Sequence, residues 1–155
     1  MKQKIIILIV VCLLIVLIMM CRSCADKPED GRLLAIDPAA QSWQGNQNLH
    51  RPSSGKEIAI PGFTHLSFLA DSTEQKVNFF NPEQNDCYFV FYLYVADNLL
   101  WQSGYCPPGN GYYSIELTES LQRGEYNAAL KIECYQEDGK QLNGASIPFT
   151  LSVED

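Results

Sequence analysis

Residues 146–153 read SIPFTLSV, a run in which large apolar side chains occupy every second position. Successive side chains of a β-strand point to opposite faces, so the run predicts a strand that buries one side and exposes the other. Pro148 cannot donate a ladder hydrogen bond, which favours a sheet edge or a bulge at this position. The side expected to be buried carries Ile147, Phe149, Leu151 and Val153.

A second run, residues 87–95, reads CYFVFYLYV and is apolar or aromatic on both faces. Phe89 and Phe91 share one face, whereas Tyr88 and Tyr92 share the other. A strand with two such faces needs cover on both, so this run is expected in the centre of a sheet.

Further short apolar runs flank these two and are separated by turn residues such as Pro-Gly, Asp-Gly and Asn-Gly pairs. No helical period of useful length follows residue 24. Seven or eight short strands in about 99 residues predict an all-β fold, an antiparallel β-sandwich. The expected strands are 57–60, 66–69, 75–80, 87–95, 99–103, 112–117, 125–135 and 146–153.

Residues 5–21 read IIILIVVCLLIVLIMMC and contain no charged side chain. As a helix they would span about 25 Å, the short end of what crosses a bilayer. The segment therefore predicts an uncleaved signal anchor in the cell membrane. Lys2 and Lys4 at its start favour a cytoplasmic N-terminus and an extracytoplasmic C-terminal domain, because positive flanks stay inside. The alternatives are a cleaved secretory signal or a lipoprotein signal ending at a cysteine.

The pattern divides the chain into three parts. Residues 1–24 are the cytoplasmic tip and transmembrane anchor, 25–55 a flexible linker or stalk, and 56–155 the β-sandwich domain. The linker is rich in proline and polar residues and has no sustained period, which predicts a coil reaching roughly 30 Å.

Charge is distributed unevenly along the chain. Residues 57–155 contain four basic and fourteen acidic residues, a net charge of −10, within a total of −7 for the whole chain. An acidic domain repels the phosphate backbone of nucleic acids, because their binding depends on Lys and Arg. Nucleic acid is therefore excluded as an expected partner, and another envelope protein is expected instead.

The stretch 121–126 reads LQRGEY and is followed by apolar residues at 128, 130, 132 and 134. This run resembles the corner before strand F in immunoglobulin-like and fibronectin-III-like sandwiches. Together with Ser103 and the Pro108-Gly109 turn, it is also similar to small membrane-anchored sandwich proteins of Gram-positive bacteria. The resemblance covers about residues 57–155. It implies that Tyr126 bonds back to upstream backbone, and it implies no activity. The chain departs from antibody domains, because it lacks their Cys-Trp-Cys core.

Strands C and F of the resembled fold pair antiparallel, which implies that Cys87 and Cys134 lie close together. A disulfide between them would close a loop of about 47 residues and stabilise the fold by roughly 4 kcal/mol. The alternative is two buried free thiols.

The other candidate thiols are expected to be free or intermolecular. Cys106 falls in a predicted turn, where exposure is expected. Cys21 and Cys24 have the spacing of a redox motif, but the first ends the predicted helix. The helix dipole disfavours a thiolate there.

Motifs of catalysis are missing from the sequence. His50 and His65 are isolated, and neither a zinc ligand set, a nucleophile elbow nor a phosphate-binding glycine loop occurs. We expect no enzyme activity, no metal and no cofactor.

Aromatic residues gather between residues 88 and 113, where nine of the chain's seventeen lie. This concentration predicts either core packing between two sheets or a platform for sugars or peptides. The candidate binding residues are Tyr88, Tyr92, Tyr94, Trp101 and Tyr112.

The anchor, linker and acidic domain together predict a non-enzymatic interaction module outside the cell, as an accessory subunit of an envelope complex. The alternative is a carbohydrate- or cell-wall-binding module that uses the aromatic face. A small hydrolase or redox factor is a third class, and the residues give it no support.

Overall fold

The computed structural model describes residues 34–45, 49–50, 58–61 and 65–155. Every regular element within these ranges is a β-strand, which confirms the predicted all-β class. The strands are β1 (Gln41–Ser42), β2 (Leu49–His50), β3 (Ile60–Pro61), β4 (His65–Leu69), β5 (Glu74–Phe80), β6 (Tyr88–Val95), β7 (Asn98–Gln102), β8 (Asn110–Glu116), β9 (Gly124–Tyr135) and β10 (Ala145–Glu154).

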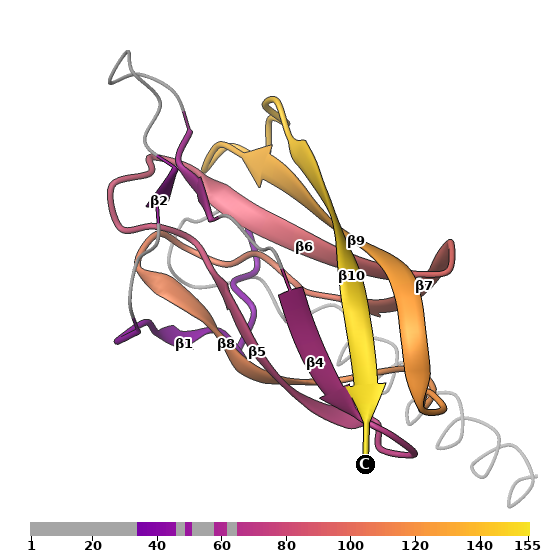
Figure 1. Cartoon of the computed structure of the whole chain (residues 1–155). Coiled ribbons are helices and arrows are strands. Elements are labelled where there is room, and N and C mark those ends of the chain that lie inside the picture. The colour runs from indigo at the N-terminus through magenta and orange to yellow at the C-terminus, as the bar shows by residue number, and fades with distance from the viewer. Residues whose placement is uncertain (1–33, 46–48, 51–57, 62–64) are drawn as a thin grey trace, which may run out of the picture. The chain divides into compact units, whose positions relative to one another are not determined.

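The strands form two main sheets and one small pair (Figure 1). The larger sheet has the order β4-β10-β9-β6-β7, and the smaller has the order β1-β8-β5. β2 pairs with β3. β4 runs parallel to β10, whereas the other paired strands of the two sheets are antiparallel. β6 lies between β9 and β7, so the prediction that residues 87–95 form a central strand is confirmed.

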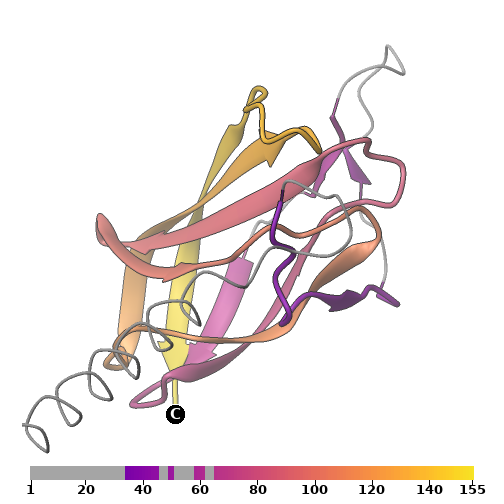
Figure 2. The same ribbon diagram turned by 180° about the vertical axis from the view of Figure 1, so that it is seen from behind.

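The two sheets enclose one hydrophobic core, and Figure 2 shows the same two layers from behind. Phe79 of β5 contacts Phe91 of β6 with ring centroids 6.1 Å apart, and Tyr112 of β8 contacts Phe91 at 6.0 Å. These ring contacts join the sheets across the core. Each buried phenylalanine contributes about 1.5–3 kcal/mol through loss of water-exposed apolar surface.

The alternation predicted for β10 is confirmed. Phe149, Leu151 and Val153 are buried, and Ile147 packs against the core. At Pro148, β10 pairs with β9, but its pairing with β4 begins only at Thr150. Pro148 therefore lies where β10 has a neighbour on one side, as the missing N–H requires.

Buried side-chain amides replace backbone pairing at two places. The backbone N–H of Leu69 donates to Gln75 Oε1 at 2.8 Å, and Gln75 Nε2 donates to the Leu69 carbonyl at 2.9 Å. Asn81 Nδ2 donates to the carbonyls of Cys87 and Cys106 at 2.8 and 3.0 Å. These bonds satisfy polar groups that would otherwise be buried without partners.

Part of the expected flexible linker is folded onto the domain. Leu34 is buried, and Gln41 of β1 pairs with Gly111 of β8. The Asp37 N–H donates to the Tyr105 carbonyl at 3.0 Å. The described residues 34–45 therefore belong to the folded domain, and its boundary lies earlier than residue 56. The linker prediction failed here because long-range partners, invisible in local composition, supply the burial.

The side chain of Trp43 holds this segment to the smaller sheet. Its ring stacks between Phe80 at 4.8 Å and Tyr113 at 4.6 Å, with interplanar angles of 6° and 15°. The Gln44 N–H also donates to the Tyr113 hydroxyl oxygen at 2.7 Å. Three stacked rings bury more apolar surface than the surrounding polar sequence suggests.

The corner before β9 contains the bond that the sequence resemblance implies. The Tyr126 hydroxyl donates to the Gln122 carbonyl at 2.9 Å. This bond holds the chain where it enters the longest strand of the larger sheet.

No helix among the described residues is long and apolar enough to cross a membrane. The predicted anchor, residues 5–21, lies outside the described ranges, as do Cys21 and Cys24.

Candidate functional site

The outward side of the larger sheet carries five tyrosines, which we call the tyrosine face. It consists of Tyr88, Tyr92 and Tyr94 on β6, Tyr135 on β9 and Tyr105 between β7 and β8, together with Lys131 and Glu133 on β9. The register pairs Tyr88 with Tyr135 and Tyr92 with Lys131. Since the intervening residues of β6 point into the core, these side chains point away from it.

Glu133 lies at the centre of a hydrogen-bond network on this face. The Tyr92 hydroxyl donates to Glu133 Oε2 at 3.0 Å, and the Tyr135 hydroxyl donates to the same oxygen at 2.7 Å. Lys131 Nζ forms an ion pair with Oε1 at 2.8 Å. One carboxylate therefore fixes two phenol rings and one ammonium group. Because these side chains are already ordered, less side-chain entropy is lost when a partner binds.

The electrostatics of the network favour the ionised carboxylate. The hydrogen bonds from Lys131 and Tyr135 lower the pKa of Glu133. The same carboxylate raises the pKa of Lys131 and, by accepting the phenol hydrogen bond, the pKa of Tyr135. Burial, followed by the contact with Glu133, raises the pKa of Tyr92. Both raised pKa values keep Tyr92 and Tyr135 as neutral phenols at neutral pH, beside a matched ion pair.

Ring contacts extend the ordered surface beyond the network. Lys131 Nζ lies 5.4 Å from the centroid of the Tyr92 ring. Tyr105 and Tyr135 meet edge to face with centroids 5.2 Å apart. Val90 shares this face and is only 5% exposed, so the neighbouring side chains cover it. The tyrosines are half-buried, with one part held by the protein and another part open.

At the β7 edge the tyrosine face continues into an exposed apolar side chain. Leu99 is the cross-strand partner of Tyr94 and is 41% exposed. The surface is therefore aromatic along β6 and aliphatic at its β7 margin, and the Lys131–Glu133 ion pair lies on the other side, on β9.

The structure places Trp101 and Tyr112 apart from the other three residues of the predicted binding group. Trp101 pairs with Leu93, and Tyr112 pairs with Phe79, both of which point into the core. Their own rings meet edge to face at 5.1 Å. Strand register decides the side on which each ring lies, so these two aromatics lie behind the sheet that carries Tyr88, Tyr92 and Tyr94.

The predicted disulfide is absent. Cys87 and Cys134 are free, buried thiols that lie near each other and interact. Cys134 is the cross-strand partner of Phe89, so the two sulfurs are diagonal neighbours rather than an opposed pair. The interaction with Cys87 and burial raise the pKa of Cys134. The alternative of two buried free thiols is the one that the structure contains.

Cys106 is also buried, contrary to the exposure expected for a turn. It forms a bridge with Phe89, in which the Cys106 N–H donates to the Phe89 carbonyl at 2.8 Å and the Phe89 N–H donates back at 2.9 Å. Burial raises the pKa of its thiol to about 12. In this environment the thiol is neutral and inaccessible to a partner chain.

Metal ligands were not expected from the sequence. His50 and His65 lie on β2 and β4. Within the described ranges, no group of three or more His, Cys, Asp or Glu side chains is close enough together to hold a metal ion.

Sequence reasoning missed four members of the tyrosine face: Tyr105, Lys131, Glu133 and Tyr135. Residues 131, 133 and 135 alternate with the apolar positions of their strand, so the period did place them on its outer side. The pairing of that strand with residues 87–95 was needed to bring them beside Tyr88 and Tyr92.

No protein-family model, curated protein or solved structure matches this chain.

Proposed function

We propose that this chain is a non-enzymatic, membrane-anchored interaction module, with an extracytoplasmic domain that binds another envelope protein through the tyrosine face. The observation that carries the proposal is the Glu133 network, which holds Tyr92 and Tyr135 in fixed positions on an open sheet surface. Tyrosine is enriched at protein interfaces because it offers a large rigid ring and a polar hydroxyl.

We further propose that the fold is immunoglobulin-like. The order β10-β9-β6 on one sheet and β8-β5 on the other corresponds to the G-F-C and E-B strands of such sandwiches. The Tyr126 hydroxyl bond to Gln122 corresponds to their tyrosine corner.

The partner that fits this surface is a protein with a basic patch. Residues 57–155 carry a net charge of −10, and the tyrosine face adds only the matched pair of Lys131 and Glu133. Long-range attraction then favours a positively charged partner, while the rings supply the contact area. Residues 5–21, as the membrane anchor, would hold the domain at the outer surface of the membrane.

Site-specific photocrosslinking in intact cells tests the proposal. A photoreactive phenylalanine analogue at Tyr94 is expected to give one defined protein adduct that weakens at high salt. The same analogue at Asn78, exposed on β5, is the matched control and is expected to give none. Tyr92→Ala and Tyr135→Ala should each reduce the adduct at position 94 at least tenfold. Equal adducts at both positions, or none at position 94, would contradict the proposal.

A carbohydrate ligand is the competing outcome at the same surface. Purified full-length protein that binds defined glycans, with binding lost in Tyr92→Ala and no adduct at position 94, would replace the protein partner by a sugar. Protease accessibility of the domain on intact cells checks the proposed orientation separately.

A further inference from the structure

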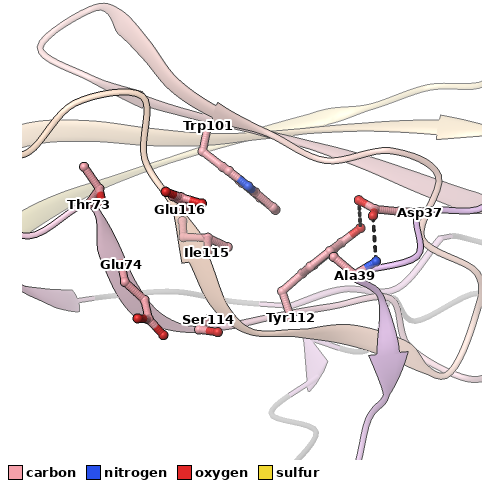
Figure 3. Close-up of a pocket in the computed structure, with 9 residues that line it drawn as sticks. All are labelled: Asp37, Ala39, Thr73, Glu74, Trp101, Tyr112, Ser114, Ile115 and Glu116. Carbon is pink, nitrogen blue, oxygen red and sulfur yellow. Dashed lines mark hydrogen bonds between the residues drawn. The ribbon is translucent and has the colours of Figure 1, made fainter.

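A pocket of about 510 Å³ opens at the margin between the two sheets, away from the tyrosine face (Figure 3). Trp101 of β7 projects into it from one sheet, and Tyr112, Ile115 and Glu116 line it from β8 of the other. Trp101 and Glu116 also line a second hollow of about 480 Å³ that reaches Leu99. Trp101 and Glu116 therefore line both hollows.

Among the described residues, every charged side chain that lines the pocket is acidic. Glu74 and Glu116 are direct cross-strand partners, and like charges in that position repel each other. Within the described part of the chain, neither carboxylate has an ion-pair or hydrogen-bond partner. Since the domain is strongly acidic overall, the pocket favours a cation and disfavours an anion.

The third carboxylate, that of Asp37, is already occupied by the protein. Its Oδ1 accepts from the Ala39 N–H at 2.9 Å, and its Oδ2 accepts from the Gly104 N–H and the Tyr112 hydroxyl, each at 2.8 Å. Asp37 therefore holds the Tyr112 wall in place, as the dashed bonds in Figure 3 show. This leaves the carboxylate of Glu116, which lies on the Trp101 side of the pocket, for a ligand.

The geometry suits an organic cation better than a metal ion. The lining carboxylates are not close enough together to form a chelating group of three within the described ranges. The partly buried ring of Trp101 lines the same space, and the buried ring of Tyr112 supports it edge to face with centroids 5.1 Å apart. Aromatic rings attract ammonium groups through the ring quadrupole, and they also pack against an apolar stem.

We propose that the pocket at Trp101 and Glu116 binds a primary alkylammonium group. The ammonium lies against the carboxylate of Glu116, and its methylene stem packs on the partly buried ring of Trp101. None of the described residues that line the pocket belongs to the tyrosine face, although the second hollow reaches Leu99 at its margin. The proposal does not depend on the protein partner proposed for that face. A lysine side chain and a free amine share this chemistry.

Nuclear magnetic resonance of the ¹⁵N-labelled full-length chain in detergent micelles tests the site. The chain has two tryptophans, so two indole N–H signals are expected, and the signal lost in Trp101→Phe identifies Trp101. N-acetyl-lysine methylamide and n-butylammonium are the probes, and N-acetyl-norleucine methylamide is the uncharged control. The Trp101 signal should shift in a saturable way with the charged probes, and the Trp43 signal should stay in place.

Removing single carboxylates distinguishes binding at one site from general attraction of the charged probes to an acidic domain. Glu116→Gln is expected to weaken probe binding at least tenfold, whereas Glu125→Gln, which removes an exposed carboxylate from β9, should change it less than twofold. Saturation by n-butylammonium alone would identify a free amine as the ligand source. Equal shifts with the norleucine derivative, or equal weakening by both substitutions, would overturn the proposal.

Discussion

The outer surfaces of the two sheets use aromatic residues in opposite ways. On the smaller sheet, Trp43, from a segment far away in the sequence, stacks on Phe80 and on one side of Tyr113, which stays 38% exposed. On the larger sheet, Tyr92 and Tyr135 are held by Glu133, and among the described residues no ring is stacked over Tyr92. The first surface has its aromatic partner within the chain. The surface of the larger sheet is ordered by Glu133 but is not covered by another ring, as expected of a surface that binds a partner.

The sharpest contrast within one strand is between Phe91 and Tyr92. Phe91 is fully buried among aromatic rings, so Phe91→Ala should destabilise the domain by about 3–5 kcal/mol. Tyr92 is half-buried, and Tyr92→Phe, which removes only the hydroxyl, should cost about 1 kcal/mol for one lost hydrogen bond. Urea unfolding of the full-length protein in detergent compares the two. Equal losses would mean that Tyr92 is a structural residue.

Removing the Trp43 ring should expose the outer surface of the smaller sheet. Trp43→Ala removes a ring stacked on both sides and should cost about 2–3 kcal/mol, with residues 34–45 becoming sensitive to protease. Trp43→Phe keeps a ring in the stack and serves as the control. A segment that stays resistant in Trp43→Ala would show that Trp43 does not hold it.

The burial of three cysteines in the domain predicts slow thiol chemistry. Cys87, Cys106 and Cys134 are buried and free, and the Cys106 pKa is raised to about 12. In the folded protein they should resist alkylation at neutral pH, and after unfolding without a reductant all three should react. Mass spectrometry of the domain peptides measures this. A pair that reacts only after reduction would restore the disulfide that the sequence suggested.

The smallest effect on stability is expected from the Lys131–Glu133 ion pair on the tyrosine face. The pKa of Glu133 is lowered from 4.5 by the hydrogen bonds of Lys131 and Tyr135. Its contribution to stability is therefore present above pH 4.5 and is lost as the pH falls through the lowered value. Glu133→Gln should be less stable than the parent at neutral pH by less than about 1 kcal/mol. The difference should disappear in acid, and a difference that is independent of pH would contradict this assignment.

Local patterns were enough to predict most of the strands. The alternation in residues 146–153 and the two-sided apolar run at 87–95 identified a half-buried strand and a central strand. Both predictions depend on periods of two residues, which burial on one or two faces imposes directly.

Features set by register or by distant contacts could not be read from the sequence. Trp101 and Tyr112 look like neighbours of Tyr92, but their strand partners turn them into the core. Trp43 lies in a polar, proline-rich stretch, and only the stack with Phe80 and Tyr113 explains its position. Glu133 on β9 binds Tyr92 on β6, and no local pattern in the sequence reveals that these two strands pair.

Tyrosine footprinting with a membrane-impermeant reagent tests the central claim most directly. Its readout is the ratio of modification in intact cells to modification in the purified full-length protein. The account predicts a low ratio at Tyr92, Tyr94 and Tyr135, where a partner covers the surface. It predicts a ratio near one at Tyr113, which is exposed on the smaller sheet. The same ratio at all four tyrosines would contradict the account.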